Sequence, residues 1–352
     1  MTAMPSPPRL LTAILALTLG ACAARAPSTA DGRLTVAEVQ DRVAALGRDH
    51  GWAEEIVYRY PGDDAPLIRA WRTPQRGPAL WILAGIHGEE PAGPNAVARS
   101  VPAIATLAAT GVPMVVVPLA NPRAYARNWR YPNTPERDWR GPGYSVGDSE
   151  YLLPDLADGT SPRAAQARGP ETQAFTTWVM QLGADYPPLL ALDLHEDELS
   201  MDGGYVYIQA PVSGVSAVAD EVVRLLSAAG MPLRMSGTTR FGEPVENGLS
   251  TRDAEGKPFR DGSVDELLSA PTVFVAGKPQ PGPNGPTVLV VETPAFAAAR
   301  LADRVRAQAA VLESLAELWR LAGQTPLDLL HAAVFQAKKS RSRETPAFPV
   351  AP

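Results

Sequence analysis

Residues 78–90 read PALWILAGIHGEE, and this stretch decides the predicted fold class. Its first nine residues are almost wholly apolar, which is typical of a strand buried on both faces of a mostly parallel sheet. The run ends in a glycine-containing turn that carries His87 and Glu90. A second apolar run, LLALDLHEDE over residues 189–198, ends in the same way at His195. Both stretches predict buried strands that present polar side chains at their carboxyl ends.

Strand-like and helix-like patterns alternate along the rest of the chain. Thr35 is a candidate N-cap for the first helix. The alternation predicts a single α/β domain, with a mixed, mostly parallel sheet and helices on both faces. Two stretches, 121–169 and 237–263, are predicted to be loops, and so long a connection as the first is typically functional. Strands are predicted at 56–60, 66–71, 78–86, 112–120, 189–194, 205–210 and 287–292, and helices at 36–46, 94–109, 171–182, 215–229 and 297–322.

The N-terminus has the features of an export signal. A basic lead ending at Arg9 precedes the apolar run LLTAILALTLGA, which is too short to cross a bilayer as a stable helix. Leu19-Gly20-Ala21-Cys22 fits a bacterial lipobox, in which Cys22 is lipidated and becomes the mature N-terminus. The alternative is an ordinary cleaved secretory signal with an incidental cysteine. Both interpretations predict export, and the first predicts a periplasmic protein anchored to the bacterial outer membrane.

Composition excludes several other classes of protein. Apolar residues make up 45% of the 352 residues and charged residues 20%, which is ordinary for a folded domain. The net charge of −6 argues against a general nucleic-acid binder and against attraction to an anionic membrane. Membrane contact is therefore expected through the lipid anchor alone. Cys22 is the only cysteine, so neither a disulfide framework nor a cysteine-ligated metal site is expected.

Two of the four histidines come directly after apolar strands, where open α/β sheets bind ligands. The spacing His87-x-x-Glu90 lets an imidazole and a carboxylate converge on one ion, and His195 completes a two-histidine, one-carboxylate set. Catalytic zinc sites use such a set and keep a fourth position for water, whose pKa falls toward about 7. Asp193 shares a strand face with His195 and is predicted to hold its imidazole.

Glu292 closes the apolar strand TVLVVE in the same manner. The alternatives are a buried structural carboxylate and a catalytic one. An unpartnered charge at the end of a buried strand is costly, which favours a functional role. We therefore predict that Glu292 is the general base, and then the general acid, of a hydrolytic reaction.

These segments, in this order, resemble the zinc carboxypeptidase superfamily. The resemblance is greatest to its branch of succinylglutamate desuccinylases, aspartoacylases and murein-peptide amidases, and it implies one zinc ion per chain. It covers about residues 78 to 320. The matching segments are GIHGEEPAG at 85–93 (first zinc motif), NPRAYARNWR at 121–130 (ending at an oxyanion-stabilising arginine), LDLHE at 192–196 (third ligand), GSVDELL at 262–268 and VVETP at 290–294 (catalytic glutamate).

The resemblance implies that Arg130 stabilises the oxyanion, with Arg127 as the other candidate. Most relatives then carry Asp-x-Asn-Arg, whose Asn-Arg pair grips a substrate carboxylate, but residues 130–153 contain no such tetrapeptide. Candidate substrate-binding residues are therefore Arg127, Arg137 and Arg140, with Arg163 and Arg168 as further possibilities. The acidic run Glu196-Asp197-Glu198 is either a solvated loop or a subsite for a cationic group.

The predicted function is zinc-dependent hydrolysis of an amide bond in the periplasm, by a metallocarboxypeptidase or peptide amidase. The alternatives are an N-acyl amino-acid deacylase of the aspartoacylase type and a non-catalytic, ligand-binding lipoprotein with the same fold. A serine hydrolase is set aside because no G-x-S-x-G motif occurs. The predicted organisation is a lipoprotein signal peptide (1–21), a flexible linker (22–32), a zinc-hydrolase catalytic domain (33–340) and a disordered tail (341–352).

Overall fold

The computed structural model describes residues 32–62, 66–131, 169–197, 202–209, 217–259, 263–275, 278–294 and 299–323. Cys22, Arg137, Arg140, Arg163 and Arg168 lie outside these residues, so their proposed roles stay predictions. The predicted signal peptide and C-terminal tail lie outside them as well. No helix in the described part of the chain is long and apolar enough to span a membrane.

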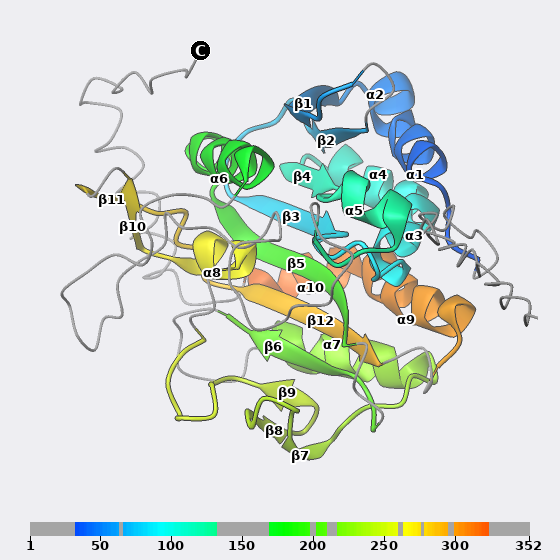
Figure 1. Ribbon diagram of the computed structural model, residues 1–352, viewed down its shortest axis with the longest axis vertical. Coiled ribbons are helices and arrows are strands. Elements are labelled where there is room, and N and C mark those ends of the chain that lie inside the picture. The colour runs from blue at the N-terminus through cyan, green and yellow to red at the C-terminus, as the bar shows by residue number, and fades with distance from the viewer. Residues whose placement is uncertain are drawn as a thin grey trace, which may run out of the picture.

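A ten-stranded mixed sheet runs through the described residues, in the order β1-β2-β4-β3-β5-β12-β6-β9-β8-β7 (Figure 1). Its four central strands, β4, β3, β5 and β12, are mutually parallel. On one side β2 pairs antiparallel with both β1 and β4, and on the other β6 pairs antiparallel with β12 and parallel with β9. The predicted mixed α/β fold is confirmed, with the parallel pairing concentrated at its centre. The bounds are β1 (Ala53–Arg59), β2 (Leu67–Arg72), β3 (Ala79–Ala84), β4 (Met114–Val117), β5 (Pro188–Asp197), β6 (Tyr205–Ile208), β7 (Ser236–Thr238), β8 (Pro244–Glu246), β9 (Leu249–Ser250) and β12 (Val288–Pro294), with a separate hairpin of β10 (Thr272–Val275) and β11 (Lys278–Pro281).

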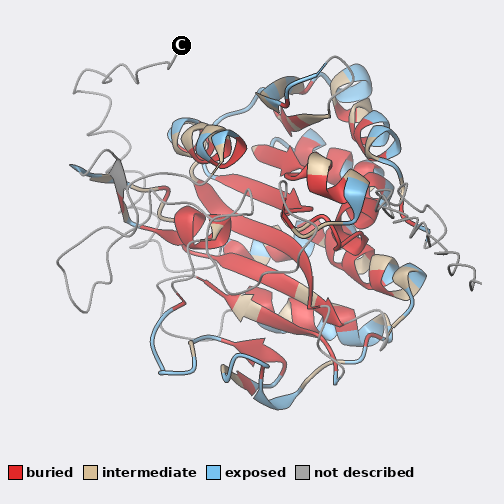
Figure 2. Ribbon diagram, in the orientation of Figure 1, coloured by how far each residue is buried: buried red, intermediate tan, exposed pale blue. Residues whose placement is uncertain are grey.

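Helices cover both faces of this sheet. Side chains along β3 alternate, so that Leu80 and Ile82 enter one core while Trp81 and Leu83 enter the other. Every residue of β3 and β5 is buried, as Figure 2 shows for the central strands. One core includes α2 (Ala45–His50), α3 (Ala92–Arg99), α4 (Val101–Ala109), α7 (Ala217–Ala228), α9 (Leu301–Glu313) and α10 (Leu315–Ala322), and the other includes α6 (Pro170–Leu182) and α8 (Val264–Ser269).

The first helix, α1 (Val36–Val43), begins where Thr35 predicts it. The Thr35 hydroxyl accepts a hydrogen bond from the Glu38 backbone N–H, and the Glu38 carboxylate accepts one from the Thr35 N–H. This reciprocal pair satisfies two donors that a helix start leaves free, which fixes the boundary.

Some boundaries differ from the sequence prediction. The helix predicted at 94–109 is interrupted at Ser100, where Pro102 cannot supply the backbone N–H of a continuous helix. The terminal helix is interrupted at Ser314. The predicted loop 237–263 contains β8 and β9, because such short strands depend on pairing with neighbours and not on local pattern.

Candidate metal centre

Three segments far apart in the sequence meet at the carboxyl ends of the central strands. His87 and Glu90 lie in the turn that follows β3, and His195 lies near the end of β5. Glu292, on the neighbouring parallel strand β12, is the direct register partner of His195. The parallel pairing of β3, β5 and β12 therefore brings these four side chains to one edge of the sheet.

Glu90 bridges the two histidines. Its Oε1 lies 2.8 Å from His87 Nδ1, and its Oε2 lies 2.9 Å from His195 Nδ1. The two imidazole rings are 4.9 Å apart, and one ligand atom from each of the three residues lies within 4.8 Å of the others. Two imidazoles and one carboxylate at this separation can converge on a single ion, and the donor set suits zinc.

The buried charges around this cluster also fit a cation. Glu89, Glu90 and Asp193 are all buried, and Oε2 of Glu89 and Oε2 of Glu292 are buried without a hydrogen-bond partner among the described residues. Arg130 is the positive side chain paired with Glu89 and Glu90. Burying several carboxylates against one guanidinium is costly, and a divalent ion between them would offset that cost.

Arg130 is brought to the cluster by the short helix α5 (Pro122–Arg127). Its Nη1 lies 3.0 Å from Glu89 Oε1 and 3.1 Å from Glu90 Oε1. Asn121 caps this helix through a hydrogen bond from the Ala124 N–H, and its Nδ2 donates to the backbone oxygen of Ile86. The helix is thus attached to the turn that carries His87.

Gly88 lets α5 approach that turn closely. A Cβ at Gly88 would overlap the backbone of Ala124 and Tyr125, so any larger residue would push the two segments apart. Arg33 donates hydrogen bonds to the backbone oxygens of Gly88 (3.2 Å) and Tyr125 (3.3 Å) and holds the same junction together. Of the two candidate oxyanion-binding arginines, Arg130 lies at the cluster, whereas Arg127 is exposed and packs over the ring of Trp129.

Residues 76–139 match the family model of the succinylglutamate desuccinylase/aspartoacylase catalytic domain. The fold is similar to that of a candidate metallopeptidase from Shewanella baltica OS155, with a TM-score of 0.59 and 20% identity over 81% of this chain and 90% of that one. It is similar to that of a second candidate metallopeptidase, from Shewanella amazonensis SB2B, with a TM-score of 0.60 and 20% identity over 79% of this chain and 91% of that one. It is also similar to the fold of carboxypeptidase A from Helicoverpa armigera, with a TM-score of 0.52 and 12% identity over 83% of this chain and 74% of that one. A comparison with curated protein sequences gave no significant match.

The chain therefore has a fold similar to that of these metallopeptidases and of this carboxypeptidase, and a family model matches its residues 76–139. The resemblance seen in the sequence is therefore confirmed, and the match to the desuccinylase/aspartoacylase branch lies on the segment that carries His87, Glu90 and Arg130. In the described residues this fold is combined with a set of side chains that could hold a metal ion, His87, Glu90 and His195.

The charges around the candidate metal ligands shift the pKa values of the two histidines in opposite directions. Burial opposes protonation of His195, but the charges of Asp193, whose Oδ1 is 3.3 Å from its Nε2, and of Glu90 outweigh burial and raise its pKa well above the usual value. Burial, followed by the charge of Arg130, lowers the pKa of His87. Asp193 thus lies beside the His195 ring, in the place that its predicted role of holding this imidazole requires.

The pKa of the Glu292 carboxyl group is raised. Burial is the largest cause that raises its pKa well above the ordinary value, and the charges of Glu90 and Asp197 act in the same direction. A raised pKa makes Glu292 a stronger proton acceptor than an ordinary carboxylate, which favours a role in general acid–base catalysis.

The acidic run after His195 differs from both sequence interpretations where it is described. Glu196 and Asp197 are buried within β5 and are not part of a solvated loop. Glu196 forms an ion pair with Arg304 of α9 and accepts a hydrogen bond of 2.7 Å from the Ala92 N–H, so it is not free to bind a cationic substrate group. Glu198 lies outside the described residues.

Sequence reasoning missed two residues of α9 that contact β5 at the site. Arg304 pairs with Glu196, and Gln308 donates to the backbone oxygen of His195. Both are buried, and they lie four positions apart, on one face of a helix whose other buried residues are apolar. The available signal was the position of these two polar residues, four apart, among the small and apolar residues of the helix predicted at 297–322.

Proposed function

We propose that this chain is a zinc-dependent hydrolase of amide bonds, of the metallocarboxypeptidase or peptide-amidase type. The observation that supports this most is the register of β12 against β5, which puts Glu292 beside His195 while His87 and Glu90 converge on the same histidine. A metal-binding set and a carboxylate of raised pKa at one sheet edge form the combination that water-mediated hydrolysis of an amide uses.

Each residue of the site has a role in this proposal. His87, Glu90 and His195 would hold zinc, and Asp193 would orient His195. Zinc, when bound, lowers the pKa of a water molecule and polarises a carbonyl group.

The protons would move through Glu292, and the developing negative charge would be met by Arg130. Glu292 accepts a proton from the attacking water and passes it to the leaving nitrogen. The Arg130 guanidinium keeps its charge because Glu90 and Glu89 raise its pKa against the effect of burial, so it can donate hydrogen bonds to the oxyanion.

The test is metal analysis of the purified protein combined with a substrate screen. We expect about one zinc ion per chain and zinc-dependent release of an amine from a peptide or N-acyl amino-acid library. Activity that persists at full rate after chelation, with no bound metal, would overturn the proposal.

A deacylase of N-acyl amino acids is the second candidate. The family match over residues 76–139 favours it, because that model describes the desuccinylase/aspartoacylase catalytic domain. Parallel assays separate the candidates: the deacylase prefers small N-acyl amino acids, and the peptidase prefers peptides or murein fragments. Ligand binding without turnover of any member of either set would favour the non-catalytic lipoprotein.

We further propose that the protein is anchored to the bacterial outer membrane from the periplasmic side through lipidated Cys22. The lipobox in the sequence supports this, and Cys22 lies outside the described residues. Mass spectrometry of the membrane fraction should find acylated Cys22, and Cys22→Ala should lose the modification. Unmodified wild-type protein, free in the periplasm, would argue against the anchor.

A further inference from the structure

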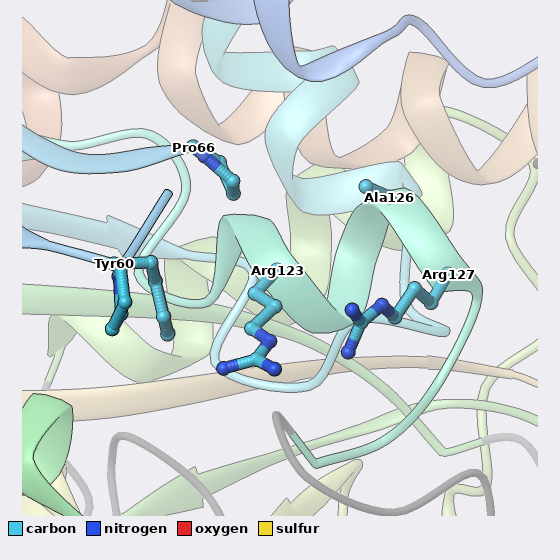
Figure 3. A pocket seen from close by; sticks show the side chains of 6 residues that line it. Tyr60, Pro66, Arg123, Ala126 and Arg127 are labelled. Carbon is cyan, nitrogen blue, oxygen red and sulfur yellow. The ribbon is translucent and has the colours of Figure 1, made fainter. Parts of the chain in front are cut away.

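A cavity of about 190 Å³ lies on the side of α5, where the end of β1 passes the helix (Figure 3). The side chains of Arg123 and Arg127 extend from the same side of the helix, and Arg123 lies beside Tyr60. The cavity contains neither a proposed metal ligand nor Glu292. It is lined by Tyr60, Pro61, Pro66, Arg123, Ala126 and Arg127.

The two arginines put positive charge on this cavity. They are four residues apart on α5, so their guanidinium groups share a helix face and repel each other. Among the described residues, neither forms a salt bridge with a carboxylate; Arg123 packs over the Tyr60 ring and Arg127 over Trp129. Partial desolvation of its guanidinium group and then the charge of Arg123 lower the pKa of Arg127. A negatively charged group bound between them would relieve this repulsion.

Tyr60 supplies a buried donor at the same place. Its side chain is 2% exposed, and its hydroxyl has no hydrogen-bond partner among the described residues. Burial and then the charge of Glu171 raise its pKa, so the hydroxyl keeps its proton. A buried hydroxyl without a partner is costly, and an acceptor oxygen in the cavity would remove that cost.

We propose that this cavity binds an oxyanion, a carboxylate or a phosphate group, between the guanidinium groups of Arg123 and Arg127 with the Tyr60 hydroxyl as an additional donor. Paired guanidinium groups and a hydroxyl are all donors, which suits an acceptor-only ligand and disfavours a cation or an apolar group. The residues of the cavity are separate from the metal cluster, so binding does not require hydrolysis.

The position of α5 connects the cavity with the proposed active site. The same helix packs on Gly88 and leads, three residues after Arg127, to Arg130 at the metal cluster. The sequence lacks the Asn-Arg pair that grips a substrate carboxylate in relatives. If the oxyanion is a carboxylate of the substrate, the cavity supplies an anion subsite; this identification, unlike the binding itself, rests on the proposed function.

The test measures binding of succinate and of inorganic phosphate by isothermal titration calorimetry, with and without bound zinc, because either anion can also bind the metal. We expect the zinc-independent binding to weaken at least about tenfold in the Arg123→Gln/Arg127→Gln double variant, which loses both charge-assisted contacts. Tyr60→Phe, which loses one neutral hydrogen bond, should weaken it about three- to tenfold. The control is Arg42→Gln on α1, an exposed arginine of another helix, which should bind as the wild type does.

The two probes distinguish the sources of the oxyanion. Tighter binding of succinate indicates a carboxylate ligand, and tighter binding of phosphate indicates a phosphate or its ester. Equal zinc-independent affinities in the wild type and the double variant, or no such binding in the wild type, would overturn the proposal. Thermal melts of each variant show whether it is folded. Because the calorimetry needs no substrate turnover, failure of the proposed hydrolysis would leave this result unaffected.

Discussion

Gln308 Nε2 donates a hydrogen bond of 2.8 Å to the backbone oxygen of His195. The same nitrogen lies 3.0 Å from the hydroxyl of Thr293, the residue after Glu292. One buried side chain of α9 therefore contacts β5 at the third proposed ligand and β12 next to the proposed base. We expect Gln308 to be a positioning residue for both.

We expect Gln308→Met to lower the free energy of unfolding by about 1–3 kcal/mol, because the buried His195 oxygen loses this donor. It should also lower kcat while zinc remains bound. Urea denaturation and steady-state kinetics measure the two effects. Gln40→Met is the matched control. Gln40 of α1 donates a similar hydrogen bond of 2.8 Å to the Leu67 oxygen of β2 and contacts no residue of the proposed site, so the variant should lose stability without a change in kcat. If Gln308→Met and Gln40→Met have the same kcat, Gln308 does not position the site.

His87→Ala should abolish stoichiometric zinc binding, because it removes one of three proposed ligands. Elemental analysis after dialysis gives the zinc content per chain. His50→Ala is the control, since His50 is exposed at the end of α2 and should not affect the metal. Retention of one zinc ion by His87→Ala would show that the ligand assignment is wrong.

Glu292→Gln should lower kcat by about 10²- to 10⁴-fold while zinc content and thermal stability stay near those of the wild type. Glutamine keeps the size of the side chain but cannot accept the proton. If zinc content and stability fall with activity, Glu292 is structural or a ligand. If activity survives within a few-fold, the base lies elsewhere, with buried Glu89 and Glu196 as the next positions to test.

Zinc binding should release about one proton per chain near neutral pH. The pKa of His195 is raised well above its usual value, so without metal this histidine is protonated, whereas the lowered pKa of His87 keeps that one neutral. A proton therefore competes with zinc at His195, and affinity should fall as the pH falls.

Below the raised pKa of His195, the apparent Kd should weaken about tenfold for each unit of pH, and above it the dependence should level off. Calorimetry in two buffers of different ionisation enthalpy counts the protons released. Asp193→Asn removes the negative charge that contributes most to the raised pKa of His195. Zinc binding to this variant should therefore release fewer protons than zinc binding to the wild type. Zinc affinity that is independent of pH would contradict this assignment.

By itself the sequence determined the central strands, the N-cap at Thr35 and the polar residues at the strand ends. These follow from local patterns, since burial on both faces produces an apolar run and a cap is formed by residues three positions apart. The order of the strand-end segments was sufficient to predict a fold like that of zinc carboxypeptidases and a common edge for His87, Glu90, His195 and Glu292.

Only the tertiary structure decided how these residues are related in space. It set Glu292 level with His195, brought Arg130 and not Arg127 to the cluster, and buried Glu196 against Arg304. Strand register and helix docking depend on the packing of segments separated by tens to hundreds of residues, so no local pattern encodes them. The same holds for the cavity beside α5, where Tyr60 and Arg123 meet only because the end of β1 passes the helix.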